Sequence, residues 1–107
     1  MDRDPTLGVY GISVMAELVG TGVQNLRAYE RRGLVSPART EGGTRRYSEQ
    51  DLVRLRRIAE LLGAGLNLAG VERVLALEAD NARLRAELTH RRQPDAADTP
   101  PTGPPPA

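Results

Sequence analysis

Apolar residues recur every three or four positions in four stretches of the chain, a spacing that predicts amphipathic α-helices. The first predicted helix begins at Ser13, a residue type that caps helix N-termini, and ends at Gly20. The second opens with Thr21 and Gln24, which have the spacing of a capping box, and ends at Gly33. Because these two helices are short and follow each other closely, we expect them to form a helix-turn-helix pair.

Two further helices are predicted in the second half of the chain. The third starts at Ser48, with Asp51 three residues on, and stops at the glycine-rich break at 63–65. The fourth starts near Asn67 and continues to about Thr89. Helices therefore dominate the predicted fold.

The segment between the second and third predicted helices carries a turn signal, Glu41–Thr44, whose two glycines are free to adopt positive φ. Short flanks that bear arginine, 38–40 and 44–47, stand on either side of this turn. We predict a two-stranded β-hairpin that projects from a helical body. The alternative interpretation is a plain glycine loop.

The amino-acid composition excludes several classes of protein. With 107 residues, 39% of them hydrophobic, the chain is long enough for one small domain. It has no cysteine and one histidine, His90, so we expect no catalytic residues, no metal site, no cofactor and no enzyme activity. No apolar run approaches the roughly 20 residues that span a bilayer, and the N-terminus is unlike a signal peptide. The sequence therefore predicts a cytoplasmic protein with no membrane partner.

Positive charge is concentrated in the middle of the chain. All 15 basic residues are arginines, and residues 24–57 hold nine of them against four acidic residues. This segment has a net charge of +5, whereas the segments before and after it each have a net charge of −2. Such clustering is typical of a nucleic-acid-binding surface. The alternative, an arginine-rich codon bias, explains the absence of lysine but not the central clustering.

In a helix-turn-helix, the second helix enters the major groove and presents its first residues to base edges. Here the buried side of that helix is expected to carry Val23, Leu26 and Tyr29. The opposite side carries side chains that suit bases or phosphates, namely Gln24, Asn25, Arg27 and Arg31. The alternative is an amphipathic helix whose charged side faces only water.

The predicted hairpin strengthens the DNA-binding interpretation. Arg39, Arg45 and Arg46 offer guanidinium groups to backbone phosphates or to a minor groove. The hydroxyl of Tyr47 can reach a phosphate, with a role in the core as the alternative for this side chain. Helix-turn-helix, hairpin and following helix together predict a mostly α fold, a winged helix-turn-helix with double-stranded DNA as its partner.

A set of short motifs extends from about residue 10 to residue 80. They are Ile12–Val14, Ala16–Leu18, Leu26–Val35, Gly43–Ser48, Asp51, Leu52 and Leu55. Together these motifs resemble the MerR family of transcriptional regulators. The phrase Gly65–Val71, followed by Val74 and Leu75, is similar to the heat-shock repressors, the HspR branch of that family.

The resemblance implies that the second helix reads DNA and that the wing holds the DNA backbone. The contacts it implies are Gln24, Asn25, Arg27, Arg31, Arg45 and Tyr47. It also implies repression of chaperone operons at inverted repeats, with the chaperone DnaK as a co-repressor. Many members of the family sense ligands through cysteines or a C-terminal domain, and we expect no small-molecule ligand here.

In the fourth predicted helix, apolar residues alternate in steps of three and four, which is the seam of a coiled coil. The seam residues are Val74, Leu77, Asn81, Leu84 and Leu88. In the MerR family this helix pairs antiparallel with its twofold mate, so the resemblance implies a homodimer, with Asn81 fixing the register. The alternative is that the stripe packs within its own chain.

We predict four segments. They are a flexible leader over 1–9, a MerR-type winged helix-turn-helix over 10–66, a helical dimerisation arm over 67–89 and a disordered proline-rich tail over 90–107. The expected protein is a homodimeric repressor. Two alternatives remain open, a phage-like recombination directionality factor, which usually lacks a dimer arm, and a protein-interaction adaptor that uses the arm and the tail.

Overall fold

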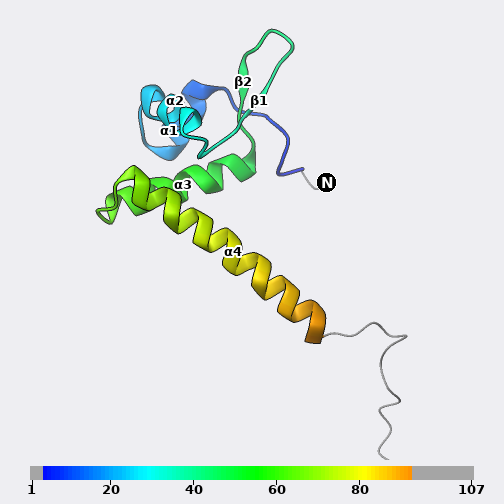
Figure 1. The fold of residues 1–107 in the computed structure, drawn as a ribbon. Helices are drawn as coiled ribbons and strands as arrows, with labels where there is room; N and C mark the ends of the chain where they lie inside the picture. The colour runs from blue at the N-terminus through cyan, green and yellow to red at the C-terminus, as the bar shows by residue number, and fades with distance from the viewer. Residues whose placement is uncertain (1–3, 93–107) are drawn as a thin grey trace, which may run out of the picture. The chain divides into compact units, whose positions relative to one another are not determined.

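The computed structural model of the protein describes residues 4–92, and most of the predicted tail lies outside them. Four helices and a two-stranded antiparallel sheet make up this part of the chain (Figure 1), which confirms the predicted mostly α fold with a hairpin wing. The elements in chain order are α1 (Ile12–Val19), α2 (Val23–Arg31), β1 (Ala38–Arg39), β2 (Arg45–Arg46), α3 (Glu49–Gly63) and α4 (Leu68–Arg92).

The starts of α1 and α2 differ from the prediction. Both N-caps are glycines, Gly11 and Gly22, in extended conformation, and neither has a side-chain capping bond. Ser13 lies inside α1 instead of capping it. The Thr21 hydroxyl accepts a hydrogen bond from a side chain, Asn25, and not from a backbone N–H at the start of α2. The two predicted side-chain caps were therefore wrong, because glycine also adopts the extended N-cap conformation.

Glycines end α1 and α2, as predicted. Gly20 and Gly33 both adopt positive φ, +83° and +76°. After α2, the Gly33 N–H donates to Glu30 and the Leu34 N–H donates to Tyr29, each at 2.9 Å. This pair of bonds is a Schellman motif, which satisfies carbonyls that the helix end would leave without partners.

A reciprocal capping box opens α3, as predicted. The Ser48 hydroxyl accepts from the Asp51 N–H at 3.0 Å, and the Asp51 carboxylate accepts from the Ser48 N–H at 2.9 Å. These bonds satisfy two backbone donors where the wing gives way to the helix. The capping box therefore sets where α3 starts relative to β2.

The wing is a short hairpin in which Ala38 pairs with Arg46 and Arg39 pairs with Arg45. At its tip the Thr40 N–H donates to Thr44 at 2.8 Å, and Gly43 takes a φ of +86°. The turn thus requires a residue that tolerates the left-handed region, and glycine does so without strain.

The segment before α1 runs beside the base of the wing. The Val9 and Tyr10 N–H groups both donate to the Tyr47 carbonyl at 2.9 Å, and the Tyr47 N–H donates to Tyr10 at 2.7 Å. A Cβ on Gly8 would lie 2.7 Å from the Arg46 Cβ and carbonyl oxygen, so only glycine fits this approach. The described part of the predicted leader is therefore tied to the wing.

The described part of the chain divides into two compact units, residues 4–72 and 73–92. The core of the first unit is built from side chains of all its helices and of the wing base. Its fully buried members are Met15, Leu26, Tyr47, Leu55, Ile58 and Val71. At the edge of this unit, Arg32 after α2 and Glu72 in α4 form an ion pair at 2.8 Å. The first turns of α4 are thus part of the packed first unit.

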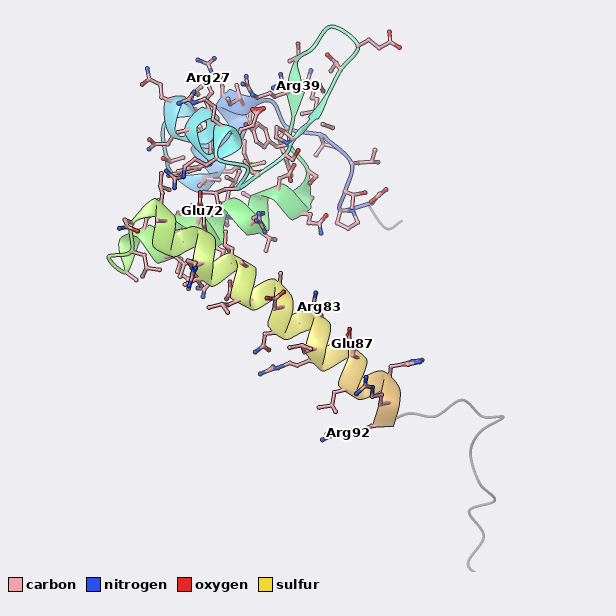
Figure 2. All side chains as sticks on the ribbon, viewed as in Figure 1. Arg27, Arg39, Glu72, Arg83, Glu87 and Arg92 are labelled. Carbon is pink, nitrogen blue, oxygen red and sulfur yellow. The ribbon has the colours of Figure 1, made fainter. Side chains whose placement is uncertain are left out.

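In the second unit, α4 extends to Arg92, three residues beyond the predicted end. Its last turn carries His90, Arg91 and Arg92, which the negative end of a helix dipole favours. Figure 2 shows Arg83, Glu87 and Arg92 along this helix. Within residues 4–92, no helix combines the length and apolar character needed to cross a membrane.

Candidate nucleic-acid interface

One face of α2 is polar and exposed, and the other is buried. Leu26 and Tyr29 are buried in the core, whereas Gln24, Arg27 and Arg31 line a shallow hollow of about 220 Å³. Figure 2 shows Arg27 projecting from α2. Because these residues are three or four positions apart, the helix brings their side chains onto one surface. Three of the predicted DNA-contacting residues therefore share a single exposed site.

Asn25, the fourth of the predicted residues on α2, is exposed and held by a neighbour. Its Nδ2 donates to the Thr21 Oγ1 at 2.8 Å, which leaves the Oδ1 acceptor and one N–H of the amide for another partner. A side-chain amide can pair with adenine through one oxygen acceptor and one N–H donor. The role of Thr21 was missed at the sequence level, where its hydroxyl was assigned to the backbone.

Two wing arginines are joined to α2 by one carboxylate. Glu30 Oε1 accepts from Arg39 Nη2 at 2.6 Å, and Glu30 Oε2 accepts from Arg45 Nε at 2.5 Å. The hydrogen bond from Arg45, helped by the charge of Arg39, holds the pKa of Glu30 below its ordinary value, although partial burial opposes the shift. Glu30 is therefore a carboxylate that connects the predicted recognition helix to the predicted wing.

Sequence reasoning missed Glu30. Nine and fifteen residues separate it from Arg39 and Arg45, and no local spacing links residues at such distances. The available signal was an acidic residue, Glu30, that stands between Arg27 and Arg31 in an otherwise basic helix. Such a signal indicates that the acidic residue forms an ion pair, but it does not indicate which arginines are its partners.

Arg46 lies on the other face of the wing ribbon, since adjacent strand residues point to opposite faces. It is exposed, and one of its terminal nitrogens lies 3.2 Å from where a Cβ on Gly11 would stand. The guanidinium group therefore lies near the start of α1. The structure thus separates Arg46 from the pair formed by Arg39 and Arg45.

Tyr47 occupies the core, and the predicted phosphate contact through its hydroxyl does not fit this position. The side chain has no exposed surface, and its hydroxyl has no hydrogen-bond partner among the described residues. Burial raises the pKa of the phenol. Tyr47 lies where the segment before α1 pairs with the base of the wing, through an antiparallel bridge to Tyr10, and its side chain belongs to the core.

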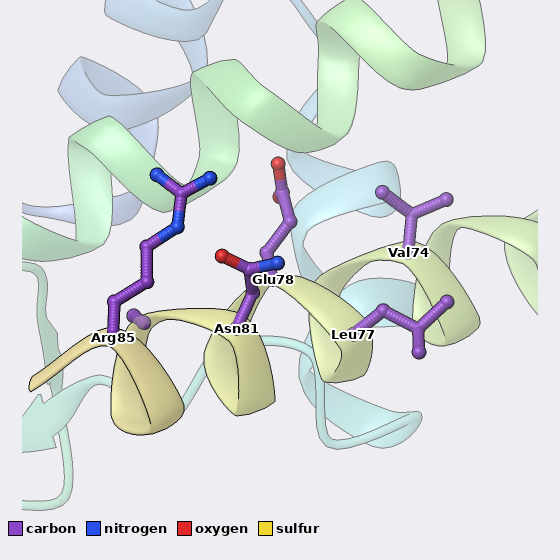
Figure 3. A pocket seen from close by; sticks show the side chains of 6 residues that line it. Val74, Leu77, Glu78, Asn81 and Arg85 are labelled. Atoms are coloured by element: carbon purple, nitrogen blue, oxygen red, sulfur yellow. The ribbon is translucent and has the colours of Figure 1, made fainter. Parts of the chain in front are cut away.

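The predicted seam of α4 is exposed except at Val74, which is half-buried. Val74, Leu77 and Asn81 line a shallow hollow of about 520 Å³ along the helix, together with Glu78, Ala82 and Arg85 (Figure 3). Leu84 and Leu88 are outside this lining, and both are exposed. Leu77 is 64% exposed, so the described part of the second unit presents apolar surface to solvent.

A helix-turn-helix followed by an arginine-bearing wing defines a class, the winged helix-turn-helix proteins that bind DNA. Within the part of the chain that is described, no three metal-ligating side chains are grouped so that they could hold a metal ion. The sequence profile of the MerR HTH family of regulatory proteins matches residues 10–78. The chain belongs to this family, which confirms the resemblance.

Named relatives agree with this assignment. A Streptomyces coelicolor protein provisionally named heat shock protein HspR is 51% identical over 79 residues, which are 73% of this chain and 52% of that protein. The transcriptional regulator GlnR of Bacillus anthracis is 37% identical over 70 residues, 65% of this chain and 54% of that protein. The chain thus spans about half the length of these curated relatives.

Solved structures share the fold. HiNmlR, a MerR family regulator lacking the sensor domain and bound to promoter DNA, is 28% identical with a TM-score of 0.62, over 77% of this chain and 65% of that one. The N-terminal part of MtaN, a multidrug transporter activator of Bacillus subtilis, is 26% identical with a TM-score of 0.60, over 78% and 89%. One of these proteins is described as a regulator and the other as an activator.

Proposed function

We propose that the protein is a homodimeric transcriptional repressor that binds an inverted-repeat operator. The observation that carries the proposal is the exposed face of α2, where Gln24, Arg27 and Arg31 surround one hollow. Wing arginines joined to the same helix through Glu30 extend this positive surface. A basic face of this kind, beside base-reading side chains, suits a duplex better than any small molecule.

In this proposal the first residues of α2 enter the major groove. Arg27 suits the O6 and N7 acceptors of guanine, and Gln24 and Asn25 suit adenine. Arg31, one turn after Arg27, reaches the same duplex and suits either a base or a phosphate. Arg46 and the free N–H groups of Arg39 and Arg45 are assigned to the phosphate backbone.

The dimer is assigned to α4. Leu77, Leu84 and Leu88 are exposed, and burial of such side chains against a second copy removes apolar area from water at about 25 cal/mol per Å². Two copies related by a twofold axis would present two recognition helices to DNA. A twofold protein requires a twofold site, which is an inverted repeat. Asn81 in this face is assigned to the register of the pair.

The direction of regulation rests on similarity. The relative with 51% identity carries the name heat shock protein HspR, and the resemblance to heat-shock repressors supports repression of chaperone genes with DnaK as co-repressor. HiNmlR, of similar fold, is described as bound to promoter DNA. Addition of DnaK to the binding reaction tests this finer assignment, since a co-repressor tightens operator binding and an unrelated chaperone does not change it.

Substitution of Arg27 tests the DNA-binding face. Arg27→Ala is expected to weaken binding to the preferred duplex by about 1–3 kcal/mol and to change binding to a random duplex much less. The matched control is Arg83→Ala, which removes the same charge from α4, where Arg83 pairs with Asp80 at 3.5 Å. Equal affinities for the Arg27→Ala variant and the unchanged protein would refute the assignment.

Substitution of Leu84 tests the dimer. Leu84→Glu places a charge in the exposed apolar face and is expected to convert a two-chain species into a single chain in sedimentation experiments. The matched control is Glu87→Ala, also on α4 but outside the predicted seam. A single-chain mass for the unchanged protein at micromolar concentration would refute a stable dimer.

A further inference from the structure

We propose that Glu30 influences DNA specificity indirectly, because it competes with DNA phosphates for Arg39 and Arg45 and so limits sequence-independent binding. Glu30 is a positioning residue in this account and makes no contact with a base. The inference rests on the proposed function, since it concerns the same DNA-binding face.

The geometry shows one acid shared by two bases. Each oxygen of the Glu30 carboxylate accepts from a different arginine, at 2.6 Å from Arg39 and 2.5 Å from Arg45. Arg39 also donates through Nη1 to the carbonyl of Gly43 at 3.0 Å, near the tip of the wing. The carboxylate thus fixes both strands of the hairpin to α2 through these two side chains.

The cluster remains open to solvent. The side chains of Arg39, Arg45 and Glu30 are 46%, 25% and 19% exposed. A DNA phosphate can therefore approach the same guanidinium groups, and it competes with a carboxylate for the same kind of N–H donor. The lowered pKa of Glu30 keeps that competitor ionised throughout the physiological range.

The competition affects random and preferred duplexes differently. Binding to a random duplex depends almost entirely on the number of phosphates neutralised, whereas binding to a preferred duplex also depends on base contacts. In the random complex phosphate contacts are the main source of affinity, and arginines that Glu30 engages are lost from them. In the specific complex base contacts hold α2 in the groove and Arg39 and Arg45 stay paired with Glu30, so the carboxylate costs that complex less affinity and the ratio of specific to random affinity rises.

The test is the salt dependence of DNA binding by Glu30→Gln, measured by fluorescence anisotropy on a random duplex and on a selected duplex. Release of one or two arginines to phosphates steepens the slope of log affinity against log salt by about 1–2 on the random duplex. The fall in affinity between about 50 and about 200 mM salt then grows by about 3- to 12-fold. The preference for the selected duplex falls.

The matched control is Glu60→Gln, since Glu60 also accepts from an arginine, Arg57, but on α3. An equally steep slope for Glu60→Gln would overturn the proposal, because the effect would then reflect net charge alone. A triple variant, Glu30→Gln with Arg39→Gln and Arg45→Gln, is expected to lose the added slope.

Other outcomes separate the two proposals. An unchanged or shallower slope for Glu30→Gln, with a folded spectrum by circular dichroism, would overturn the role of Glu30 and leave the DNA-binding face intact. If Glu30→Gln fails to fold, the Arg39→Gln and Arg45→Gln pair in the unchanged background replaces it, and a slope loss near 2 would overturn the proposal. Failure of the unchanged protein to bind any duplex would refute the proposed function itself.

Discussion

The Asn25 side-chain amide donates a hydrogen bond of 2.8 Å to the Thr21 hydroxyl, one helical turn earlier in the chain. This bond fixes how the amide of an exposed residue is presented at the start of α2. A side chain that is already oriented loses less conformational entropy when it binds a base. Thr21 thereby contributes to recognition without a contact of its own.

Thr21→Val keeps the shape of the side chain but removes the acceptor. We expect the affinity for the preferred duplex to fall by about 0.5–1.5 kcal/mol, the net value of one hydrogen bond, with random binding unchanged. Anisotropy titrations on both duplexes measure this. Thr21→Ser retains the hydroxyl and should behave like the unchanged protein, and equal losses for both variants would contradict the account.

Tyr47→Phe tests the correction at the base of the wing. The buried Tyr47 hydroxyl has no hydrogen-bond partner within residues 4–92, so its removal is expected to raise the free energy of unfolding by about 1 kcal/mol, as an unsatisfied buried group is relieved. DNA affinity should not change. Urea unfolding and a binding titration provide the two readings, and a loss of DNA affinity would restore the phosphate contact that the sequence suggested.

Gly8→Ala tests the close contact between the N-terminal segment and the wing. The added Cβ meets the Arg46 Cβ and carbonyl oxygen at 2.7 Å, so the N-terminal segment and β2 must move apart. We expect the free energy of unfolding to fall by about 1–3 kcal/mol. Gly63→Ala is the control in open space at the end of α3, where the same change should stabilise by about 0.4–1 kcal/mol.

The pH dependence of stability is expected to report the Glu30 cluster. Arg45 lowers the folded-state pKa of Glu30, so the stabilisation is complete above the unfolded-state pKa, about 4.3, and is lost as the pH falls through the lowered value. Denaturant unfolding of the unchanged protein and of Glu30→Gln between neutral pH and pH 3 measures this. Their difference should be constant near neutrality and shrink in acid, and a difference that grows in acid would contradict the assignment.

The sequence was sufficient to predict features that depend on residues close together in the chain. The capping box of Ser48 and Asp51 joins residues three apart, and the stops at Gly20 and Gly33 need only one residue type. The N-caps of α1 and α2 were assigned wrongly because serine or threonine near a helix start competes with glycine for that position. Local patterns thus locate helices better than they locate the first residue of each helix.

The candidate site could be predicted only in part. The exposed face of α2 follows from helical periodicity, since burial of Leu26 and Tyr29 turns Gln24, Arg27 and Arg31 outward. The Glu30 cluster depends on how the wing folds back on α2, and the burial of Tyr47 depends on the segment around Tyr10. Contacts between elements decide both, and no spacing within one element encodes them.

Selection of duplexes from a randomised pool, by the purified protein at near-physiological salt, tests the central claim most directly. A twofold dimer that inserts one α2 from each chain into successive major grooves should enrich an inverted repeat, with half-sites at least one helical turn, about 10 base pairs, apart. Enrichment of a single half-site, or of no sequence at all, would contradict the claim that the protein is a dimeric, sequence-specific regulator.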